Sequence, residues 1–428
     1  MARLRYIRLS PHRPAVVDGN VEWRPVINQI EHPRIPVLVW ENAGPWREAN
    51  LWAMQRVMER EVHPDTVRAN MNSLLMYARW LEETDTSWWD FPVKKADRCL
   101  VRFRGFVIKM RDADTIAPST ASQRMRDVIN FYRWLQASSF LKSSWPLWQE
   151  RTINIRFVSS VGFERTMSVQ TTDLHIPNRK SIGEKLEDGL LPVSAADRDQ
   201  IISFVHSNGS WELYLLLTLG FYTGMRIGTL CDLKIDTIRN ATPEPLNPNM
   251  YRIAVGPGAR PSVKTKFGVT GSPWITAEHR DLLLRYIVSP RRQVRVKKAT
   301  ADSKNLVFLT KNGNPYVSGD SERSSAINVE VYTMRRKAAA QRLKVFQGFY
   351  FHRSRATFAT QLTSILLPIA GVAPTLGVVM EAMLHKDEMT TLKYIKFVQR
   401  APMKEAMANE FTKAFMGAIK AKDQTNEG

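Results

Sequence analysis

Five residues in the C-terminal half of the chain have side chains that suit chemistry on a phosphodiester. They are two arginines, two histidines and a late tyrosine, in the order Arg226, His352, Arg355, His385 and Tyr394. Planar guanidinium groups match the non-bridging phosphate oxygens with paired hydrogen bonds and stabilise the charge that builds up in a pentavalent transition state. A phenol is a nucleophile once its proton, held with a pKa of about 10, is taken up. This set predicts a site that binds a phosphodiester and attacks it through the tyrosine.

Each of these residues also has an ordinary structural interpretation. Arg226 fits a surface or helix-capping arginine. His352 and Arg355 are three residues apart, a spacing that is common on basic helices, where it places two side chains on one face. Tyr394, taken alone, is typical of a half-buried core tyrosine. The order and spacing of the five residues together favour the catalytic interpretation.

Three short motifs surround these residues. The first is Thr-Gly-Met-Arg at 223–226, the second is His-Arg-Ser-Arg-Ala-Thr-Phe-Ala-Thr at 352–360, and the third places His385 nine residues before Tyr394. With these motifs the sequence resembles the tyrosine recombinase (phage integrase) family. That family carries Thr-Gly-Leu/Met-Arg, then His-x-x-Arg with Thr-Phe-Ala-Thr, and then His or Trp nine residues before its nucleophilic tyrosine. The resemblance covers residues 190 to 400 in outline.

The resemblance implies an enzyme that cleaves and rejoins DNA strands. Tyr394 would attack a phosphodiester to form a 3′-phosphotyrosyl link and release a 5′-hydroxyl, and His352 would take up the phenol proton. Arg226 and Arg355 would clamp the phosphate, and His385 would add a hydrogen bond to it. Because the energy of the broken bond stays in the protein–DNA link, the resemblance implies no ATP, no metal ion and no other cofactor.

A lysine completes the site that the resemblance implies. The family uses a lysine on a β-hairpin between the first arginine and the His-x-x-Arg helix to protonate the leaving oxygen. The segment 263–268 lies at that place and contains Lys264 and Lys266. We take Lys264 as the candidate, and Lys266 stays open because the register of a hairpin can shift by two residues. An exposed strand lysine without a catalytic role is the plain alternative.

Three positions differ from the family pattern. Thr229 stands where the family has a Glu or Asp that supports the first arginine, and Asp232 or another group could replace that carboxylate. Ala356 replaces a histidine after the second arginine, and Leu384 replaces a glycine before the last histidine. None of these changes removes a proposed catalytic group. They predict a divergent branch in which the surroundings of the site have changed.

The composition agrees with a polyanionic partner. The chain has 428 residues, with 61 Lys and Arg against 41 Asp and Glu, a formal net charge of +20 and a pI of about 10.0. A surface of this charge attracts nucleic acid, although a soluble basic protein without such a partner is the plain alternative. Cys99 and Cys231 are the two cysteines, and they fit neither a disulfide framework nor a zinc cluster. They indicate a reducing compartment.

We expect neither a signal peptide nor a membrane anchor from this sequence. Residues 1–8 lack the apolar core of a signal peptide. Residues 356–380 carry no charged side chain, but Pro368, Gly371 and Pro374 predict a buried pair of helices with a turn between them rather than a membrane span. We therefore expect a cytoplasmic protein, associated with the nucleoid, of prokaryotic or viral origin and without membrane contact.

The pattern along the chain predicts a mainly α fold with a small antiparallel β-sheet. We expect a helical core-binding (DNA-clamping) domain followed by a mixed α+β tyrosine-recombinase catalytic domain. The predicted divisions are an N-terminal extension at 1–44, the core-binding domain at 45–145, a linker at 146–190, the catalytic domain at 191–400 and a tail helix at 401–428.

Local signals predict where individual helices start. Pro64 opens a helix with a clear apolar stripe. Thr120 with Gln123, and Ser194 with Asp197, each form a capping box at the start of a helix.

Other segments predict strands, a basic surface and a tail. Short strands are expected at 251–255, 262–266 and 273–275. The basic run at 291–298 is either a phosphate contact or a solvated insertion. The tail helix packs on its own domain or docks into a neighbouring protomer through an apolar stripe of Met403, Met407, Phe411, Phe415 and Ala418.

The N-terminal extension and the long linker favour the integrase or transposase of a mobile element over a chromosome-dimer resolvase. Two alternatives stay open: a catalytically inactive DNA-binding accessory protein of the same fold, and a type IB topoisomerase-like strand-passage enzyme. The resemblance implies double-stranded DNA as the partner, with a dimer on one site and a homotetramer on two duplexes. It also allows for accessory DNA-bending proteins.

Overall fold

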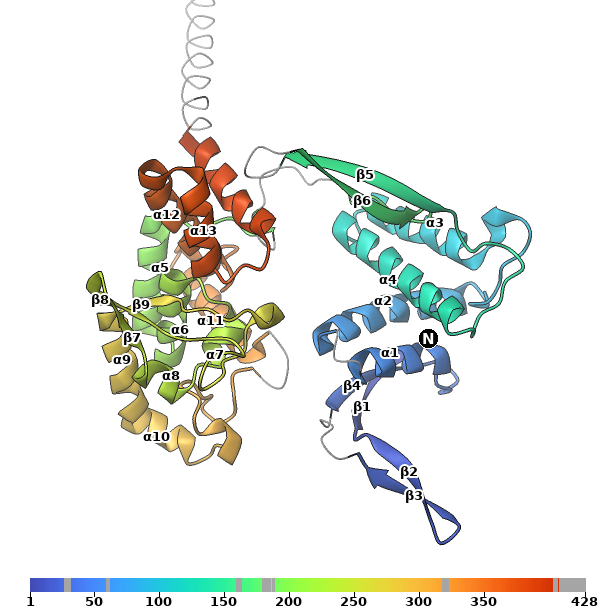
Figure 1. Cartoon of the computed structure of the whole chain (residues 1–428), viewed down its shortest axis with the longest axis horizontal. Helices are drawn as coiled ribbons and strands as arrows, with labels where there is room; N and C mark the ends of the chain where they lie inside the picture. Colours follow the sequence, from blue (N-terminus) through green and yellow to red (C-terminus); the bar gives the residue numbers. More distant parts are fainter. Residues whose placement is uncertain are drawn as a thin grey trace, which may run out of the picture. The chain divides into compact units, whose positions relative to one another are not determined.

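The fold consists of two compact units, Met1–Ile182 (unit 1) and Gly183–Gly428 (unit 2), shown in the ribbon of Figure 1. It is known from a computed structural model that describes residues 1–26, 32–58, 62–158, 164–178, 186, 189–317, 323–402 and 407. The chain is mainly helical with small antiparallel sheets, which confirms the predicted fold class. None of the described helices is both long enough and apolar enough to cross a membrane.

Four α-helices form the body of the described part of unit 1: α1 (Arg47–Met58), α2 (Pro64–Glu83), α3 (Cys99–Asp112) and α4 (Pro118–Ala137). A short 3₁₀ turn, η1 (Lys95–Asp97), precedes α3. The helices bury an aromatic core around Trp46, Tyr77 and Phe131, in which ring centroids lie 4.6 to 6.3 Å apart, as in the Trp46–Phe131 pair at 5.4 Å. Aromatic pairs in this range add to the stability that burial supplies.

The start of α2 follows its signal in the sequence. Pro64 stands in the first turn, where its missing N–H removes no helical hydrogen bond, and the His63 ring accepts a hydrogen bond from the N–H of Asp65. The helix predicted from Pro64 is therefore confirmed.

The start of α4 differs from the prediction. The helix begins at Pro118, after Ala117, and the side chain of Gln123 donates to Asp127 at 2.7 Å instead of reaching back to the helix start. The capping box predicted at Thr120 is wrong, because the proline two residues earlier already starts the helix.

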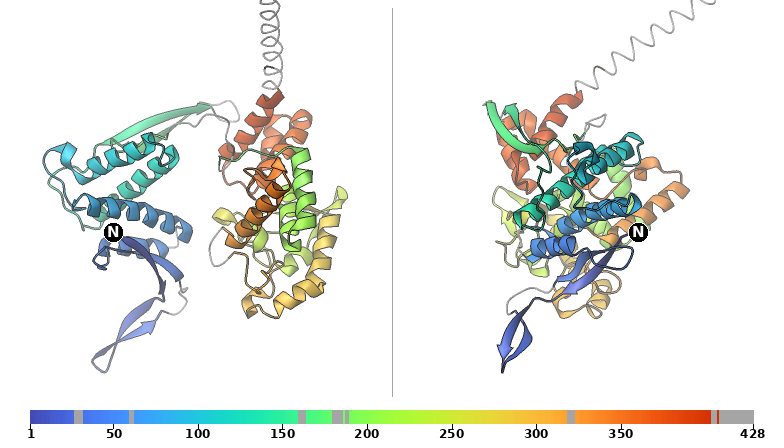
Figure 2. Two further views of the ribbon diagram at one scale, coloured as in Figure 1. Left: turned by 180° about the vertical axis from the view of Figure 1, so that it is seen from behind. Right: turned by 90° about the vertical axis from the view of Figure 1, so that its right-hand side faces the viewer.

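Unit 1 also carries paired strands before and after its helices. At the N-terminus, β1 (Arg3–Leu9) pairs with β4 (His32–Val39), and β2 (His12–Val17) pairs with β3 (Asn20–Pro25), both antiparallel. Ala2, Ile35 and Leu38 pack into the helical core, whereas the β2–β3 hairpin projects away from it (Figure 2). After α4, β5 (Glu150–Val158) and β6 (Glu164–Thr172) form a further antiparallel pair.

Unit 2 surrounds one apolar helix, α6 (Trp211–Thr223). Residues on all sides of α6 are buried, as expected for a central helix. Ser194 caps the preceding helix by accepting a hydrogen bond of 3.0 Å from the N–H of Asp197, which confirms that predicted start. The described helices of unit 2 besides α6 are α5 (Ala195–Asn208), α7 (Ile227–Cys231), α8 (Ile235–Arg239), α9 (Ala277–Val288), α10 (Pro290–Val296), α11 (Ser325–Ala340), α12 (Arg353–Ala370), α13 (Val372–Ala382) and helical residues 388–402.

The uncharged segment at 356–380 forms the predicted helical pair. It spans most of α12 and α13, which are separated at Gly371, a residue with φ of +72°. Tail residues 403–406 and 408–428 lie outside the described residues, and with them most of the predicted tail stripe. Met407 is helical and exposed.

A three-stranded antiparallel sheet lies beside these helices, in the order β7 (Thr242–Glu244), β8 (Asn247–Arg252) and β9 (Trp274–Thr276). The strands predicted at 251–255 and 273–275 correspond to β8 and β9 with shifted ends. The strand predicted at 262–266 is wrong. Only the bridge between Gly256 and Val263 forms there, and a 3₁₀ turn, η3 (Lys266–Gly268), follows with φ of +64° at Phe267.

The basic run at 291–298 is largely structural. Arg292 is 2% exposed, and Arg295 is also buried. Both guanidinium groups donate to backbone carbonyls of the segment that follows η4 (Ala301–Ser303). Their partners are the carbonyl oxygens of Lys304, Leu306, Val307 and Leu309. These two arginines are neither phosphate contacts nor part of a solvated insertion, because they hold α10 against residues 304–309.

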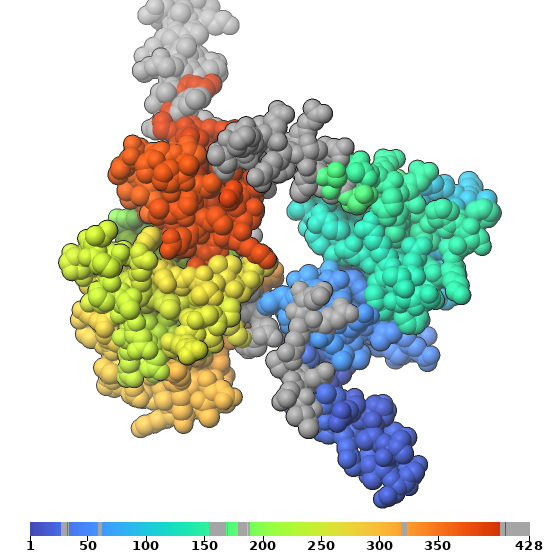
Figure 3. All heavy atoms as spheres, in the orientation of Figure 1, coloured from blue at the N-terminus to red at the C-terminus, as the bar shows by residue number. Residues whose placement is uncertain are grey.

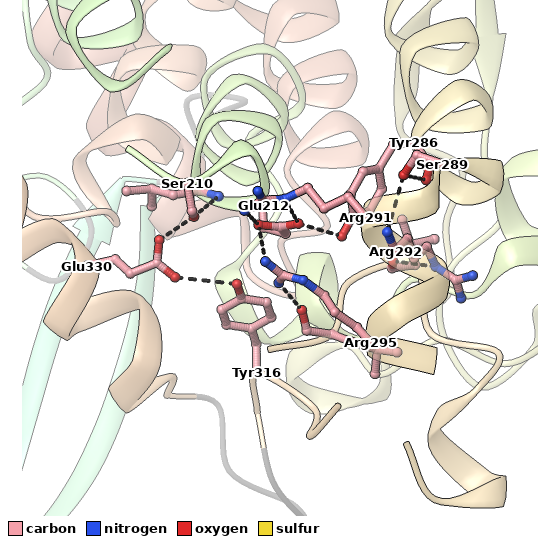
Figure 4. Close-up of polar contacts among 12 residues, drawn as sticks. Ser210, Glu212, Tyr286, Ser289, Arg291, Arg292, Arg295, Tyr316 and Glu330 are labelled. Carbon is pink, nitrogen blue, oxygen red and sulfur yellow. Dashed lines mark hydrogen bonds and ion pairs between the residues drawn. The ribbon is translucent and has the colours of Figure 1, made fainter. Parts of the chain in front are cut away.

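A fully buried carboxylate compensates this positive charge. Glu212, in the first turn of α6, accepts hydrogen bonds of 2.8 Å from both Nε and Nη2 of Arg291, and one of 2.7 Å from Arg295 (Figure 4). The hydroxyl of Tyr286 donates a further bond of 3.0 Å. Burial opposes ionisation of Glu212, but the hydrogen bond from Arg291 and the charge of Arg295 outweigh it and lower the pKa of this carboxyl.

Replacing Glu212 with glutamine is expected to lower the free energy of unfolding by about 3–5 kcal/mol at neutral pH, because it leaves the buried guanidinium of Arg295 without its counter-charge. Denaturant titration with a fixed m-value would measure this loss. Since the pKa of Glu212 is lowered in the folded state, its contribution is complete above the pKa of the unfolded chain and disappears as the pH falls through the folded value. The variant should therefore lose less stability on acidification than the parent. An equal loss in both proteins would contradict this assignment.

Candidate active site

The turn between α6 and α7 carries the first proposed catalytic arginine. Gly224 ends α6 with φ of +65°, and a Cβ there would lie 2.4 Å from the Phe358 ring and 2.7 Å from the Met383 sulfur. Both the conformation and the close packing require glycine. Arg226 then stands at the N-cap of α7 and is half-buried. The Thr-Gly-Met-Arg motif is thus a tight turn that presents an arginine.

The start of α12 carries the second motif. His352 occupies the N-cap position and is half-buried, and Arg355 lies in the first turn. Arg353 donates to the carbonyls of Leu191 and Pro192 at 3.0 and 3.1 Å, and burial lowers its pKa. These bonds hold the beginning of α12 against the segment before α5, so the placement of His352 and Arg355 depends on the packed fold.

Arg355 connects three of the motifs. Its side chain is 1% exposed, and it donates 2.6 Å to the carbonyl of Gly224 and 2.8 Å to that of Met383. The first carbonyl lies two residues before Arg226 and the second lies two residues before His385. One guanidinium therefore holds the α6–α7 turn and the end of α13 together.

His385 and Tyr394 lie ring against ring. Their centroids are 6.0 Å apart with an interplanar angle of 16°, and His385 Nδ1 shares a hydrogen bond of 2.8 Å with the hydroxyl of Thr391. Tyr394 is 0% exposed and packs among Ala356, Ala359 and other apolar residues. The proposed nucleophile thus lies beside His385, and its side chain is covered by the surrounding residues.

Leu384 stands at one of the departures from the family pattern. It adopts φ of +52°, a left-handed conformation in which glycine has the least strain, at the end of α13. Its side chain is buried, and its Cδ2 lies 2.4 Å from the place where a Cβ on Gly271 would be. In the space-filling view, a yellow segment lies against the orange-red surface of the part of the chain that includes α12 and α13 (Figure 3). Leu384 thereby joins the His385 turn to the loop of Lys264.

The exposed Lys264 lies in that loop, immediately after the Val263 bridge. Its backbone N–H donates 2.8 Å to Oδ2 of Asp232, the residue that ends α7. Lys266, the alternative, belongs to the following 3₁₀ turn, with its ammonium 5.3 Å from the centroid of the Phe267 ring. The loop therefore holds the backbone of Lys264 directly against the helix that begins at Arg226.

The structure brings the predicted residues into one region of unit 2. Contacts through Arg355 join the segments of Arg226, His352 and His385, and Tyr394 stacks on His385. Lys264 is linked to the same region through Asp232 and through the packing of Leu384 on its loop. Sequence reasoning missed the hydrogen bond between Thr391 and His385, although the pair of threonines before Tyr394 was a signal for a polar partner.

No protein-family model and no curated protein matches the sequence. Among solved structures, the Tn1549 transposon integrase in complex with a circular intermediate DNA matches with a TM-score of 0.50 and 15% identity, covering 84% of this chain and 99% of that one. A lambda integrase (75–356) dimer bound to a COC′ core site matches with a TM-score of 0.46 and 12% identity, covering 82% and 94%. The chain has the tyrosine recombinase fold. The fold expected from the sequence motifs is thereby confirmed.

Within this tyrosine recombinase fold, Thr229 occupies a buried position, which suits its uncharged side chain. Thr229 is 4% exposed in the middle of α7, where an unpaired carboxylate would be costly. The nearest acidic residue along the chain, Asp232, directs its carboxylate to Lys264 and Lys234. The negative charge at the end of α7 is therefore that of Asp232, which contacts the loop that contains Lys264.

Proposed function

We propose that the protein is a site-specific DNA recombinase that cleaves and rejoins strands through a 3′-phosphotyrosyl intermediate. The observation that carries this proposal is the pair of bonds from Arg355, which hold the turns of Arg226 and His385 together beside Tyr394. Two guanidinium groups, imidazoles and a phenol within one packed region are the groups that in-line attack on a phosphodiester requires.

The proposed reaction follows from the chemistry of each group. The Tyr394 oxygen forms a bond to phosphorus while the bond to the 5′-oxygen breaks, and the phenol proton passes to His352. Arg226 and Arg355 stabilise the charge on the non-bridging oxygens, with a hydrogen bond from His385. Lys264 gives a proton to the departing 5′-oxygen. Attack of a 5′-hydroxyl from a partner strand reverses the step and rejoins the DNA.

The burial of Tyr394 adds a requirement. Because its side chain is 0% exposed and lies on helical residues 388–402, a DNA phosphate reaches it only if this helix shifts. We propose that DNA binding causes that shift. Such coupling would keep the nucleophile unreactive until substrate is bound.

The proposed partner is double-stranded DNA, bound by a dimer on one site and by a homotetramer on two duplexes. The net charge of +20 supports a polyanionic partner. The structurally similar Tn1549 protein is a transposon integrase in complex with DNA, which supports a role in a mobile element. The proposed catalytic residues are Arg226, Lys264, His352, Arg355, His385 and Tyr394.

One observation favours a second candidate, a DNA-binding protein without catalysis. A fully buried Tyr394 is also what a structural tyrosine would show. A type IB topoisomerase shares the proposed cleavage step and differs in the joining step.

Covalent capture distinguishes these functions. The full-length chain is incubated with a library of random-sequence duplexes that carry a nick, so that the cut fragment diffuses away and the intermediate is trapped. After denaturation, DNA that stays attached to protein is sequenced, and the modified residue is located by mass spectrometry. We expect phosphotyrosine at Tyr394 and a shared DNA sequence. DNA binding without any adduct would favour the accessory protein, and rejoining of single duplexes without exchange between two would favour the topoisomerase.

A further inference from the structure

We infer that Asp232 is a positioning residue for Lys264, a role that rests on the proposed function of this lysine as the proton donor. The carboxylate of Asp232 accepts the backbone N–H of Lys264 at 2.8 Å and thereby fixes where the lysine side chain leaves the loop. Asp232 itself does not touch the reacting atoms. In this chain, the carboxylate of Asp232, which follows Arg226 in the sequence, binds the loop that contains Lys264.

The position of Asp232 in the fold makes this link direct. Helix α7 has five residues, with Arg226 at its N-cap and Asp232 at its C-cap. The C-cap is held by bonds from the backbone N–H of Asp232 to the carbonyls of Gly228 and Thr229, at 3.2 and 3.1 Å. One rigid turn of helix therefore sets the spacing between a proposed phosphate-binding arginine and the proposed proton donor.

The ammonium of Lys234 holds the carboxylate in place. Oδ1 of Asp232 accepts a hydrogen bond of 2.6 Å from the ammonium of Lys234, while Oδ2 accepts the backbone N–H of Lys264. The side chains of Asp232 and Lys234 are 18% and 22% exposed, so the pair is partly shielded from solvent. Both carboxylate oxygens are thus engaged, and the Asp232 side chain has one preferred orientation.

The rest of the loop would survive loss of this bond. Val263 is 1% exposed in the core of unit 2 and bridges to Gly256, and the hydroxyl of Thr265 donates 2.6 Å to the carbonyl of Val269. These contacts lie on either side of Lys264 and do not involve Asp232. Removal of the carboxylate should therefore loosen the loop at Lys264 without unfolding it.

The consequence concerns one step of the reaction. Proton transfer to the leaving 5′-oxygen requires the lysine ammonium within hydrogen-bond reach, and a displacement near 1 Å costs about 10²-fold in rate. A leaving group that needs no proton is insensitive to that displacement. A 5′-thiol is such a group, because thiols have a pKa of about 8.5 and leave as thiolates.

The test compares two duplexes of the captured sequence, with oxygen or sulfur at the bridging 5′ position. For Asp232→Ala, we expect cleavage of the oxygen duplex to fall about 10²-fold and cleavage of the sulfur duplex to stay near the parent rate. Asp232→Asn keeps an oxygen that accepts the Lys264 N–H and should retain most of the activity. In a Lys264→Ala background, Asp232→Ala should cause no further loss. Asp236→Ala, on the exposed surface of α8, is the matched control and should behave as the parent.

Equal losses on both duplexes, or parent rates on the oxygen duplex, would overturn the inference. Hydrogen exchange provides a readout that needs no cleavage. The backbone amides around Lys264 should exchange faster in Asp232→Ala than in the parent protein, and at the parent rate in Asp236→Ala. Absence of a covalent adduct with the parent protein would contradict the proposed function alone, because the exchange result still decides whether Asp232 holds the loop. Unchanged exchange in Asp232→Ala would contradict that anchoring role.

Discussion

Replacing Tyr394 with phenylalanine is expected to abolish the covalent protein–DNA adduct while leaving DNA binding intact. The variant lacks the only atom that can form the phosphotyrosyl bond at this position, so the expected loss is complete rather than partial. The ring stays stacked on His385, and the change in free energy of unfolding should be about 1 kcal/mol, the range of a single hydroxyl contact. Denaturing gels report the adduct, and gel shifts report binding.

Tyr332→Phe is the matched control for this prediction. Tyr332 lies on α11 and is 58% exposed, so removing its hydroxyl should change neither adduct formation nor stability. An adduct that persists in Tyr394→Phe would show that another residue is the nucleophile and would remove the basis of the proposed mechanism.

The two arginines are expected to respond differently to substitution by alanine. Arg226→Ala should slow strand cleavage by about 10³- to 10⁵-fold, as for other arginines that neutralise a transferring phosphoryl group, with little change in stability, because Arg226 is half-buried at a helix start. Arg355→Ala should slow strand cleavage by the same factor as Arg226→Ala, and should also lower the free energy of unfolding by about 2–4 kcal/mol. It leaves the carbonyls of Gly224 and Met383 without their buried donor.

Single-turnover cleavage on the captured duplex and denaturant titration measure the two effects separately. Arg239→Ala, which removes an exposed arginine of α8, is the control and should change neither quantity appreciably. If Arg226→Ala reduced DNA binding and cleavage by the same factor, the arginine would act in binding only. A stable Arg355→Ala protein would contradict the connecting role given to Arg355.

Local sequence signals predicted the helix starts correctly where the cause of the start lies within a few neighbouring residues. The cap at Ser194 and the proline start at Pro64 need only a few neighbouring residues, and both are confirmed. The apolar run that forms α6 is central because no polar face interrupts it. The capping box at Thr120 failed since a competing start, Pro118, lay two residues away.

Longer-range features were predicted less well. A strand at 262–266 needs a partner along its whole length, and the fold supplies only the Val263 bridge before turning at Phe267. Arg292 and Arg295 look like surface cations in a basic run, yet they are buried because Glu212, far away in the sequence, meets Arg295 in the interior, and backbone carbonyls receive both arginines. Charge patterns along a chain do not reveal which cations will find a buried acceptor.

For the candidate site, the sequence by itself determined which groups are chemically competent and in what order they occur: Arg226, His352, Arg355, His385 and Tyr394. Their types and spacing within each motif are local properties. Only the tertiary structure decided that Arg355 reaches a carbonyl 131 residues away, that Tyr394 is covered, and that Asp232 holds the loop of Lys264. Such contacts depend on how whole helices pack, and packing is settled by the combined burial of many residues rather than by any one motif.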